Sequence, residues 1–192
     1  MKHFVFLVAL VCVLCASLNP VKAVSNTELQ DTSRFARIIS KGDTGGGDGK
    51  YIELSTIRDN STDAHTKNIE AKIYVVLPSS DLIREYKVRY DYDLNLSFAN
   101  MVAKAPELKT RLPDFSLNEL WNIKMMESGI VGMVLNQQNY TLNGESKPTQ
   151  PALKGYENVT FLTPTDFDFE NYHVANRIFK IVYGTFYDDV TR

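Results

Sequence analysis

The residues from Tyr86 to Phe98 alternate between apolar and polar side chains without a break. Successive side chains of a β-strand point to opposite faces, so this run predicts a strand with one apolar and one polar face. It is much longer than the usual strand of about 5–6 residues. A strand of this length favours an extended, curved antiparallel sheet with one covered side.

Other segments predict partners for this strand. Ile69–Leu77 alternates in the same way and ends at Pro78, which has no N–H for a sheet ladder. The short connection that follows predicts a large hairpin with the long strand. Strand composition also occurs in residues 51–57, 130–142 and 158–163, and the Asn143-Gly144 dipeptide predicts a turn.

Helical periodicity appears near both ends. Residues 27–41 have an apolar stripe and stop at Gly42, which opens a glycine-rich loop to Gly49. Near the C-terminus, polar and apolar side chains again fall on opposite helical faces. The polar face holds His173, Asn176, Arg177, Lys180 and Gly184, and the apolar face holds Val174, Ala175, Ile178, Phe179, Ile181 and Val182. The predicted fold is α+β, with a long, curved antiparallel sheet packed against an N-terminal and a C-terminal helix.

Two central segments are harder to assign. Residues 99–114 contain Pro106 and Pro113 and predict a crossing or irregular segment. Residues 115–126 fit two patterns: Ser116 and Glu119 resemble a helix capping box, whereas the alternation around Trp121 fits a strand. Because a long sheet needs further partners, the prediction is a strand, with the helix as the alternative.

The N-terminus has the pattern of a secretory signal peptide. Lys2 precedes an apolar stretch from Phe4 to Ala16, and small residues allow cleavage after Ala16 or Ala23. The stretch is shorter than the roughly 20 residues of a membrane span. We expect a signal peptide over residues 1–23 and a single secreted, extracellular α+β domain over 24–192, without a transmembrane anchor. Cys12 and Cys15, the only cysteines, lie in the leader, so the mature chain has no disulfide.

Four acceptor sequences for N-glycosylation follow the leader. They place glycans at Asn60, Asn95, Asn139 and Asn158. A single such triplet is common by chance, but four after a signal peptide agree with secretion. These asparagines are therefore predicted glycosylation sites.

Composition argues against charge-driven partners. Loss of Lys2 and Lys22 with the leader changes the formal net charge from −2 to −4, and no basic block remains. Nucleic-acid binding and electrostatic membrane docking are therefore not expected.

No pattern typical of catalysis is present. Asp166, Asp168, Glu170 and His173 could bind a metal, but acidic residues also suit the first turn of a helix. The glycine-rich loop lacks the Lys-Ser or Lys-Thr ending of a phosphate-binding loop. Same-face carboxylates such as Asp91 and Asp93 are common in alternating strands. The expectation is a protein that is not an enzyme and has no cofactor or metal.

The apolar face of the long strand is the candidate ligand surface. Such a long face must be covered, by helices in part and by an apolar ligand elsewhere, although an ordinary core is the simpler interpretation for most of its residues. The candidate ligand-binding residues are Tyr86, Val88, Tyr90, Tyr92, Leu94, Leu96, Phe98 and Trp121.

Three passages carry a resemblance to a known family. They are Ala71-Lys72-Ile73-Tyr74-Val75-Val76 leading into residues 85–94, then Asp114-Phe115-Ser116-Leu117, and finally Asp168-Phe169-Glu170-Asn171-Tyr172 before the last helix. In this layout the chain resembles the tubular lipid-binding proteins, such as mite group 7 allergens and insect takeout and juvenile-hormone-binding proteins. The resemblance implies a bent sheet wrapped around helices, with apolar ligands held between them. The present chain is shorter and lacks the N-terminal disulfide of the takeout group.

Two functions are therefore expected as alternatives. The first is a secreted, non-catalytic glycoprotein that binds an apolar small molecule or lipid in a cavity between the sheet and the helices. The second is a secreted protein-interaction effector with a dry core, of an immune, salivary, venom or reproductive kind. In the second, function would lie in loops such as Gly42 to Gly49 or Lys147 to Gly155.

Overall fold

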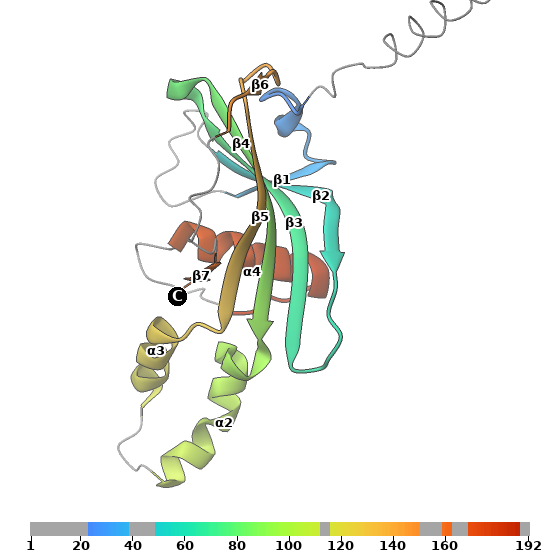
Figure 1. The fold of residues 1–192 in the computed structure, drawn as a ribbon. Helices are drawn as coiled ribbons and strands as arrows, with labels where there is room; N and C mark the ends of the chain where they lie inside the picture. Colours follow the sequence, from blue (N-terminus) through green and yellow to red (C-terminus); the bar gives the residue numbers. More distant parts are fainter. Residues whose placement is uncertain (1–22, 39–48, 112–115, 150–158, 163–168, 189–192) are drawn as a thin grey trace, which may run out of the picture.

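The computed structural model describes residues 23–38, 49–111, 116–149, 159–162 and 169–188. The described part is an α+β fold with a curved sheet, as predicted (Figure 1). Its strands are β1 (Phe35–Ile38), β2 (Gly49–Asp59), β3 (Thr66–Leu77), β4 (Leu82–Asp93), β5 (Ile130–Tyr140), β6 (Ser146–Lys147) and β7 (Val159–Leu162). Its helices are α2 (Phe98–Arg111), α3 (Leu117–Met126) and α4 (Phe169–Tyr183), with 3-10 turns η1 (Glu28–Gln30), η2 (Pro78–Ser80) and η3 (Leu94–Leu96).

The sheet is antiparallel throughout its described pairings. Its strand order is β1-β2-β3-β4-β5-β6, and β7 pairs with β5 outside this path. The predicted hairpin is confirmed: β3 and β4 pair continuously from Thr66↔Asp93 to Leu77↔Leu82. The predicted turn after β5 is also present, with Gly144 at φ +84°.

The long strand is shifted from its predicted position. β4 begins at Leu82, but it ends at Asp93 rather than continuing to Phe98. The Asp93 side chain accepts a hydrogen bond from Asn95 N at 2.9 Å, which starts a 3-10 turn, and Phe98 is the first residue of α2. A short polar side chain thus offers the backbone an alternative to the sheet ladder, which the alternation does not reveal.

The buried residues of β4 lie on different faces of the sheet in the two halves of the strand. Ile83 and Glu85 are buried on one side, whereas Val88, Tyr90 and Tyr92 are buried on the other. The change coincides with an irregularity in the pairing of β4 with β5, between Lys87 and Val88. Such a bulge increases the local twist of the sheet.

The sheet therefore has two cores on opposite faces. The larger core joins the sheet to α4, and β3 contributes Ile69, Ala71 and Ile73 to it. The smaller core lies under the N-terminal segment, and β3 contributes Tyr74 and Val76, which follow Ile73 and point to the opposite face. Because neighbouring strand residues face opposite ways, one strand supplies both cores.

The predicted N-terminal helix over 27–41 is wrong. Its first part is only the 3-10 turn η1, and Phe35–Ile38 is strand β1, paired with β2. Leu29 and Phe35 are buried in the smaller core, and Ala36 packs against the larger one. Pairing with β2 lets Phe35 and Ala36 contact different cores on opposite faces of the sheet, which a single helical stripe does not do.

Helices also replace the structures predicted between β4 and β5. Residues 98–111 form α2 with Pro106 inside it, so the prediction of an irregular segment is wrong for this part. Residues 117–126 form α3, so the strand prediction is wrong and the capping-box alternative is right. Glu119 accepts a hydrogen bond from Ser116 N at 2.6 Å. Figure 1 shows α2 and α3 side by side at the edge of the sheet where β4 ends and β5 begins.

The C-terminal helix is confirmed as α4, which lies across one face of the sheet (Figure 1). Val174, Ala175 and Ile178 are fully buried against the sheet. Two positions differ from the predicted faces: Asn176 is buried, and Ile181 is exposed. Among the described helices, none is both long and apolar enough to span a bilayer.

Several predictions lie outside the described residues. These are the leader through Lys22, the loop residues 42–48, Asn158, residues 112–115, residues 150–157 and the pair Asp166 and Asp168.

Candidate functional site

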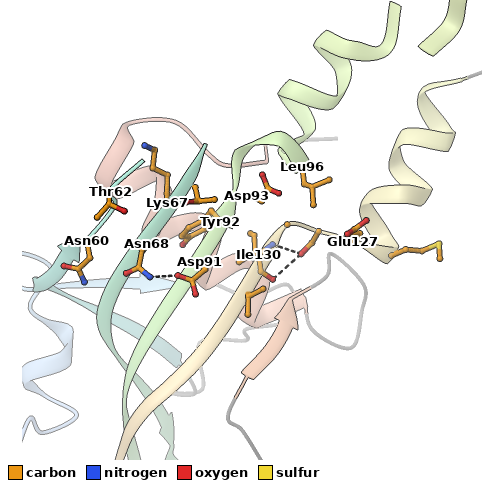
Figure 2. Close-up of a pocket in the computed structure, with 15 residues that line it drawn as sticks. Asn60, Thr62, Lys67, Asn68, Asp91, Tyr92, Asp93, Leu96, Glu127 and Ile130 are labelled. Atoms are coloured by element: carbon orange, nitrogen blue, oxygen red, sulfur yellow. Dashed lines mark hydrogen bonds between the residues drawn. The ribbon is translucent and has the colours of Figure 1, made fainter. Parts of the chain in front are cut away.

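A groove of about 890 Å³ opens where the β3–β5 end of the sheet meets α3 (Figure 2). We call it the β3–α3 groove. Its lining comes from the β2–β3 connection, from β3, β4 and β5, from η3 and from the end of α3. The lining residues are Asn60, Thr62, Thr66, Lys67, Asn68, Asp91, Tyr92, Asp93, Leu96, Met126, Glu127, Ser128, Gly129, Ile130 and Val131. This volume is within the usual range of small-molecule sites, about 300–1,000 Å³.

One side of the groove is polar. Asn68 on β3 donates a hydrogen bond to the Asp91 carboxylate on β4 (Figure 2). Lys67 donates to the Asp63 carbonyl at 2.9 Å, and its ammonium lies 5.9 Å from the centre of the Tyr183 ring. The lining residues include three carboxylates, those of Asp91, Asp93 and Glu127, and one lysine. The charge balance favours a neutral or cationic polar group over an anionic one.

The other side is apolar. Leu96 comes from η3, Ile130 from the start of β5, and Met126 from the last turn of α3. Met126 is 86% exposed, whereas Ile130 is buried. Covering a large, solvent-exposed apolar side chain at the rim of a groove with a ligand lowers the free energy of the complex. Methionine also adapts its shape to different ligands.

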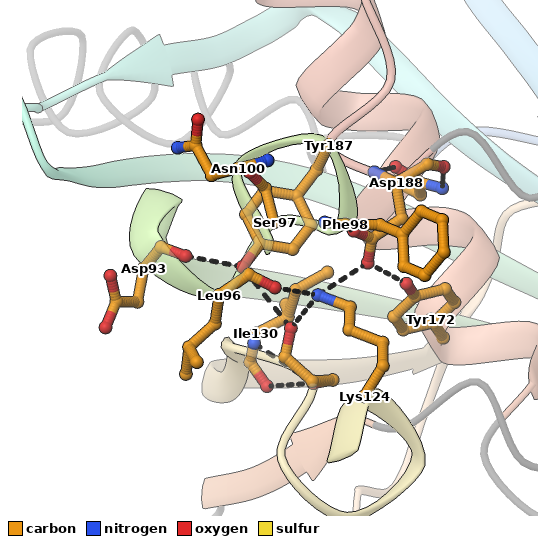
Figure 3. Close-up of polar contacts among 12 residues, drawn as sticks. Asp93, Leu96, Ser97, Phe98, Asn100, Lys124, Ile130, Tyr172, Tyr187 and Asp188 are labelled. Atoms are coloured by element: carbon orange, nitrogen blue, oxygen red, sulfur yellow. Dashed lines mark hydrogen bonds and ion pairs between the residues drawn. The ribbon is translucent and has the colours of Figure 1, made fainter. Parts of the chain in front are cut away.

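Behind the groove lies a buried ion pair. Lys124 on α3 and Asp188 after α4 are both 0% exposed, and Lys124 Nζ is 2.8 Å from Asp188 Oδ2 (Figure 3). Lys124 also donates hydrogen bonds to the backbone carbonyls of Leu96 and Ser128, and its ammonium lies 4.4 Å from the centre of the Tyr187 ring.

The partners of Asp188 come from two other elements. Its carboxylate accepts hydrogen bonds from the Tyr172 hydroxyl and, at 2.6 Å, from Phe98 N at the start of α2. Asn176 fixes the backbone of the same residue, because its amide donates to the Asp188 carbonyl at 2.6 Å and accepts from Asp188 N. Burial lowers the pKa of Lys124, and the neighbouring Asp188 opposes that shift. We call these contacts the Lys124–Asp188 network.

This network determines the position of the groove wall. Leu96 and Ser128, whose carbonyls bind Lys124, both line the groove. Between them and the core, Gly129 has φ +76°, and a Cβ there would lie 2.6 Å from Leu96 Cβ. A glycine is therefore required at this close approach. The groove wall is held by backbone contacts to buried side chains.

The structure separates the predicted ligand residues into three groups. Val88, Tyr90 and Tyr92 are buried against α4, and Tyr86 and Leu94 pack against the same core. Tyr92 donates a hydrogen bond to Ala175 O at 2.8 Å. Tyr92 and Leu96 also line the groove. Phe98 and Trp121 contact one another at 5.7 Å between ring centres, joining α2 to α3 outside the groove lining.

Sequence reasoning missed Lys67, Asn68 and the Lys124–Asp188 network. Only Lys124 carried a usable signal. It follows Leu120 by four residues, so on a capped helix it lies on the buried side, where a lysine needs a partner. The assignment of 115–126 to a strand concealed this signal.

The predicted glycan sites have different surroundings. Asn60 and Asn95 are exposed, and Asn60 belongs to the groove lining. Asn139 is half-buried and its amide donates to Pro148 O at 3.2 Å. Among the described residues, no three His, Cys, Asp or Glu side chains gather as metal ligands would.

Comparison of the chain with protein-family models, curated proteins and solved structures finds no match. The resemblance to tubular lipid-binding proteins therefore stays a prediction, and the functional argument depends on the geometry of the groove.

Proposed function

We propose that this protein is a secreted, non-catalytic glycoprotein that binds an apolar or amphipathic small molecule in the β3–α3 groove. The observation that carries the proposal is the groove itself, with Leu96, Met126 and Ile130 on one side and amide and carboxylate groups on the other. A ligand with an apolar body and a polar end matches both sides. Burial of apolar surface contributes about 25 cal/mol per Å², so a few hundred Å² can offset the cost of immobilising a small ligand.

The location differs from the cavity first expected under the tyrosine-rich face. Around Tyr92, that face lies against Ala175 and Phe179 of α4, with the Tyr92 and Phe179 rings 5.0 Å apart. The groove lies at the end of this face, between the sheet and α3. The ligand we propose therefore occupies an open site and keeps one side near solvent.

The first test uses the protein secreted from insect cells. Native mass spectrometry reports its glycans and any ligand that copurifies. The neutral fluorescent probe N-phenyl-1-naphthylamine is then titrated, and decylamine, decanol and decanoic acid compete with it at pH 7.5. Because the groove lining contains three carboxylates and only one lysine, we expect the amine and the alcohol to displace the probe at lower concentrations than the acid.

A pair of variants locates the binding. Met126→Gln should weaken probe binding about tenfold, since a polar amide replaces an apolar contact worth about 1–1.5 kcal/mol. Val102→Gln on α2 is the matched control, because Val102 is also exposed but does not line the groove. Probe binding that is absent, or equal in Met126→Gln and the unmodified protein, would contradict the proposal.

The second candidate, a protein-interaction effector, is favoured by a different observation. Val102, Ile123 and Met126 are large apolar side chains exposed on the α2–α3 pair. Such residues are typical of protein-binding surfaces. If the probe does not bind and Val102→Gln and Met126→Gln both abolish capture of one protein partner, this second function replaces the first.

A further inference from the structure

A second hollow, of about 300 Å³, lies between the edge strand β1 and α4. Its lining shares no residue with the β3–α3 groove. Arg37 and Ile38 come from β1, His173 and Arg177 from α4, and Phe186 from the segment after it. Of the described residues that line it, three are basic and none is acidic.

The helix geometry gathers basic side chains here. His173 and Arg177 are four residues apart on α4, so their side chains lie on the same helical face. One turn further, the Lys180 ammonium lies 4.1 Å from the centre of the Phe186 ring. Arg37 approaches from β1. This arrangement gathers cationic groups around one aromatic ring on a chain whose formal net charge is negative.

We propose that this hollow binds a small organic phosphate, of the size of an aryl phosphate. The phosphate group would pair with the guanidinium groups of Arg37 and Arg177, because a guanidinium fork matches phosphate oxygens with two parallel hydrogen bonds. The apolar part of the ligand would lie against Phe186 and Ile38. A volume near 300 Å³ is at the lower end for ligand sites, which fits one ring and one anionic group.

Two of the lining residues already make contacts within the protein. Arg37 and His173 each have an interaction within the protein. A guanidinium has five N–H donors and can keep one partner while it binds an anion. His173 is half-buried, and burial lowers its pKa, so its imidazole is neutral at pH 7.5 in the absence of an anion. Its resonances therefore report directly on a negative charge placed beside it.

The experiment is an NMR titration of protein with isotope-labelled histidine, at pH 7.5. Phenyl phosphate, inorganic phosphate and phenol are compared as probes. We expect phenyl phosphate to move the His173 resonances saturably and more tightly than either fragment. His65 should not move, because it is next to Thr66 of the β3–α3 groove. Its response therefore identifies binding at the other site, and the two proposals can fail separately.

Charge-removing variants complete the test. Arg37→Gln and Arg177→Gln should each weaken phenyl phosphate binding about tenfold, the loss expected for one charge-assisted hydrogen-bond pair. Arg58→Gln removes the same charge from an exposed arginine outside the hollow and should leave binding unchanged. Thermal unfolding of each variant checks that the fold is intact.

Three results would overturn the proposal. One is phenyl phosphate binding that does not move His173. Another is equal affinity in Arg177→Gln, Arg58→Gln and the unmodified protein. The last is equal affinity for phenyl phosphate and phenol, which would remove the role of the anion.

Discussion

Lys124 and Asp188 are charged side chains that are fully buried, and several of their partners lie far away in the sequence. Lys124 is on α3, Asp188 follows α4, and Phe98 N begins α2. A buried ion pair of this kind is weak support for stability by itself, but removing one member leaves an uncompensated charge. The pair also fixes the carbonyls of Leu96 and Ser128 at the groove wall.

We therefore expect Lys124→Met to lower the free energy of unfolding by about 3–5 kcal/mol, because the Asp188 carboxylate is left buried without its cation. The double variant Lys124→Met with Asp188→Asn should recover part of this loss, since no charge then remains buried. Urea unfolding measures both. Lys104→Met on α2 is the control, because Lys104 is exposed. A loss no greater than that of the control would show that the ion pair has little influence on stability.

At the scale of elements, α3 shows how local capping competes with alternation. Residues 116–126 satisfy both patterns, and the helix forms with Glu119 accepting a hydrogen bond from Ser116 N at 2.6 Å. Helix formation turns Leu120 and Lys124 to the buried side and leaves Ile123 and Met126 exposed. The helix thereby presents Met126 to the groove.

Glu119→Ala should lower the stability of α3 by about 0.5–1 kcal/mol, because it removes both the cap and a negative charge at the helix N-terminus. Fluorescence of Trp121, the only tryptophan and a residue of α3, follows the local unfolding in urea. Glu107→Ala on the exposed surface of α2 is the matched control. If both variants shift the Trp121 transition equally, the cap has no special role.

At the scale of the whole molecule, the tyrosines of the larger core make stability depend on pH. Burial raises the pKa of Tyr90, Tyr92, Tyr172 and Tyr187, and burial together with the Asp59 hydrogen bond raises the pKa of Tyr183 to about 12. A tyrosine in the unfolded chain ionises near pH 10. The folded state therefore holds protons that the unfolded state releases above that pH.

From this difference we expect the contribution of these tyrosines to stability to be fully present below about pH 10 and to be lost as pH rises toward 12 and beyond. Absorbance at 295 nm should show exposed tyrosines ionising near pH 10 and the buried ones ionising together as the protein unfolds. Far-ultraviolet circular dichroism measures the unfolding independently. Gradual ionisation of all ten tyrosines near pH 10 while the fold persists would contradict the burial described.

The amino-acid sequence determined the sheet most directly. Alternation in β3 and β4, a proline after Leu77 and an Asn-Gly turn specify strands and their connections, because side chains two residues apart in a strand share one face of the sheet. The same holds for the apolar stripe of α4. These features are local, so the pattern of residues was enough to predict an α+β fold with a curved sheet.

Tertiary structure alone decided where the candidate site lies. Phe35–Ile38 became a strand because β2 was available to pair with it. The β3–α3 groove joins residues from several segments of the chain, and its wall depends on the carbonyl groups that bind Lys124. Such contacts depend on packing between residues distant in sequence, and no local periodicity records them.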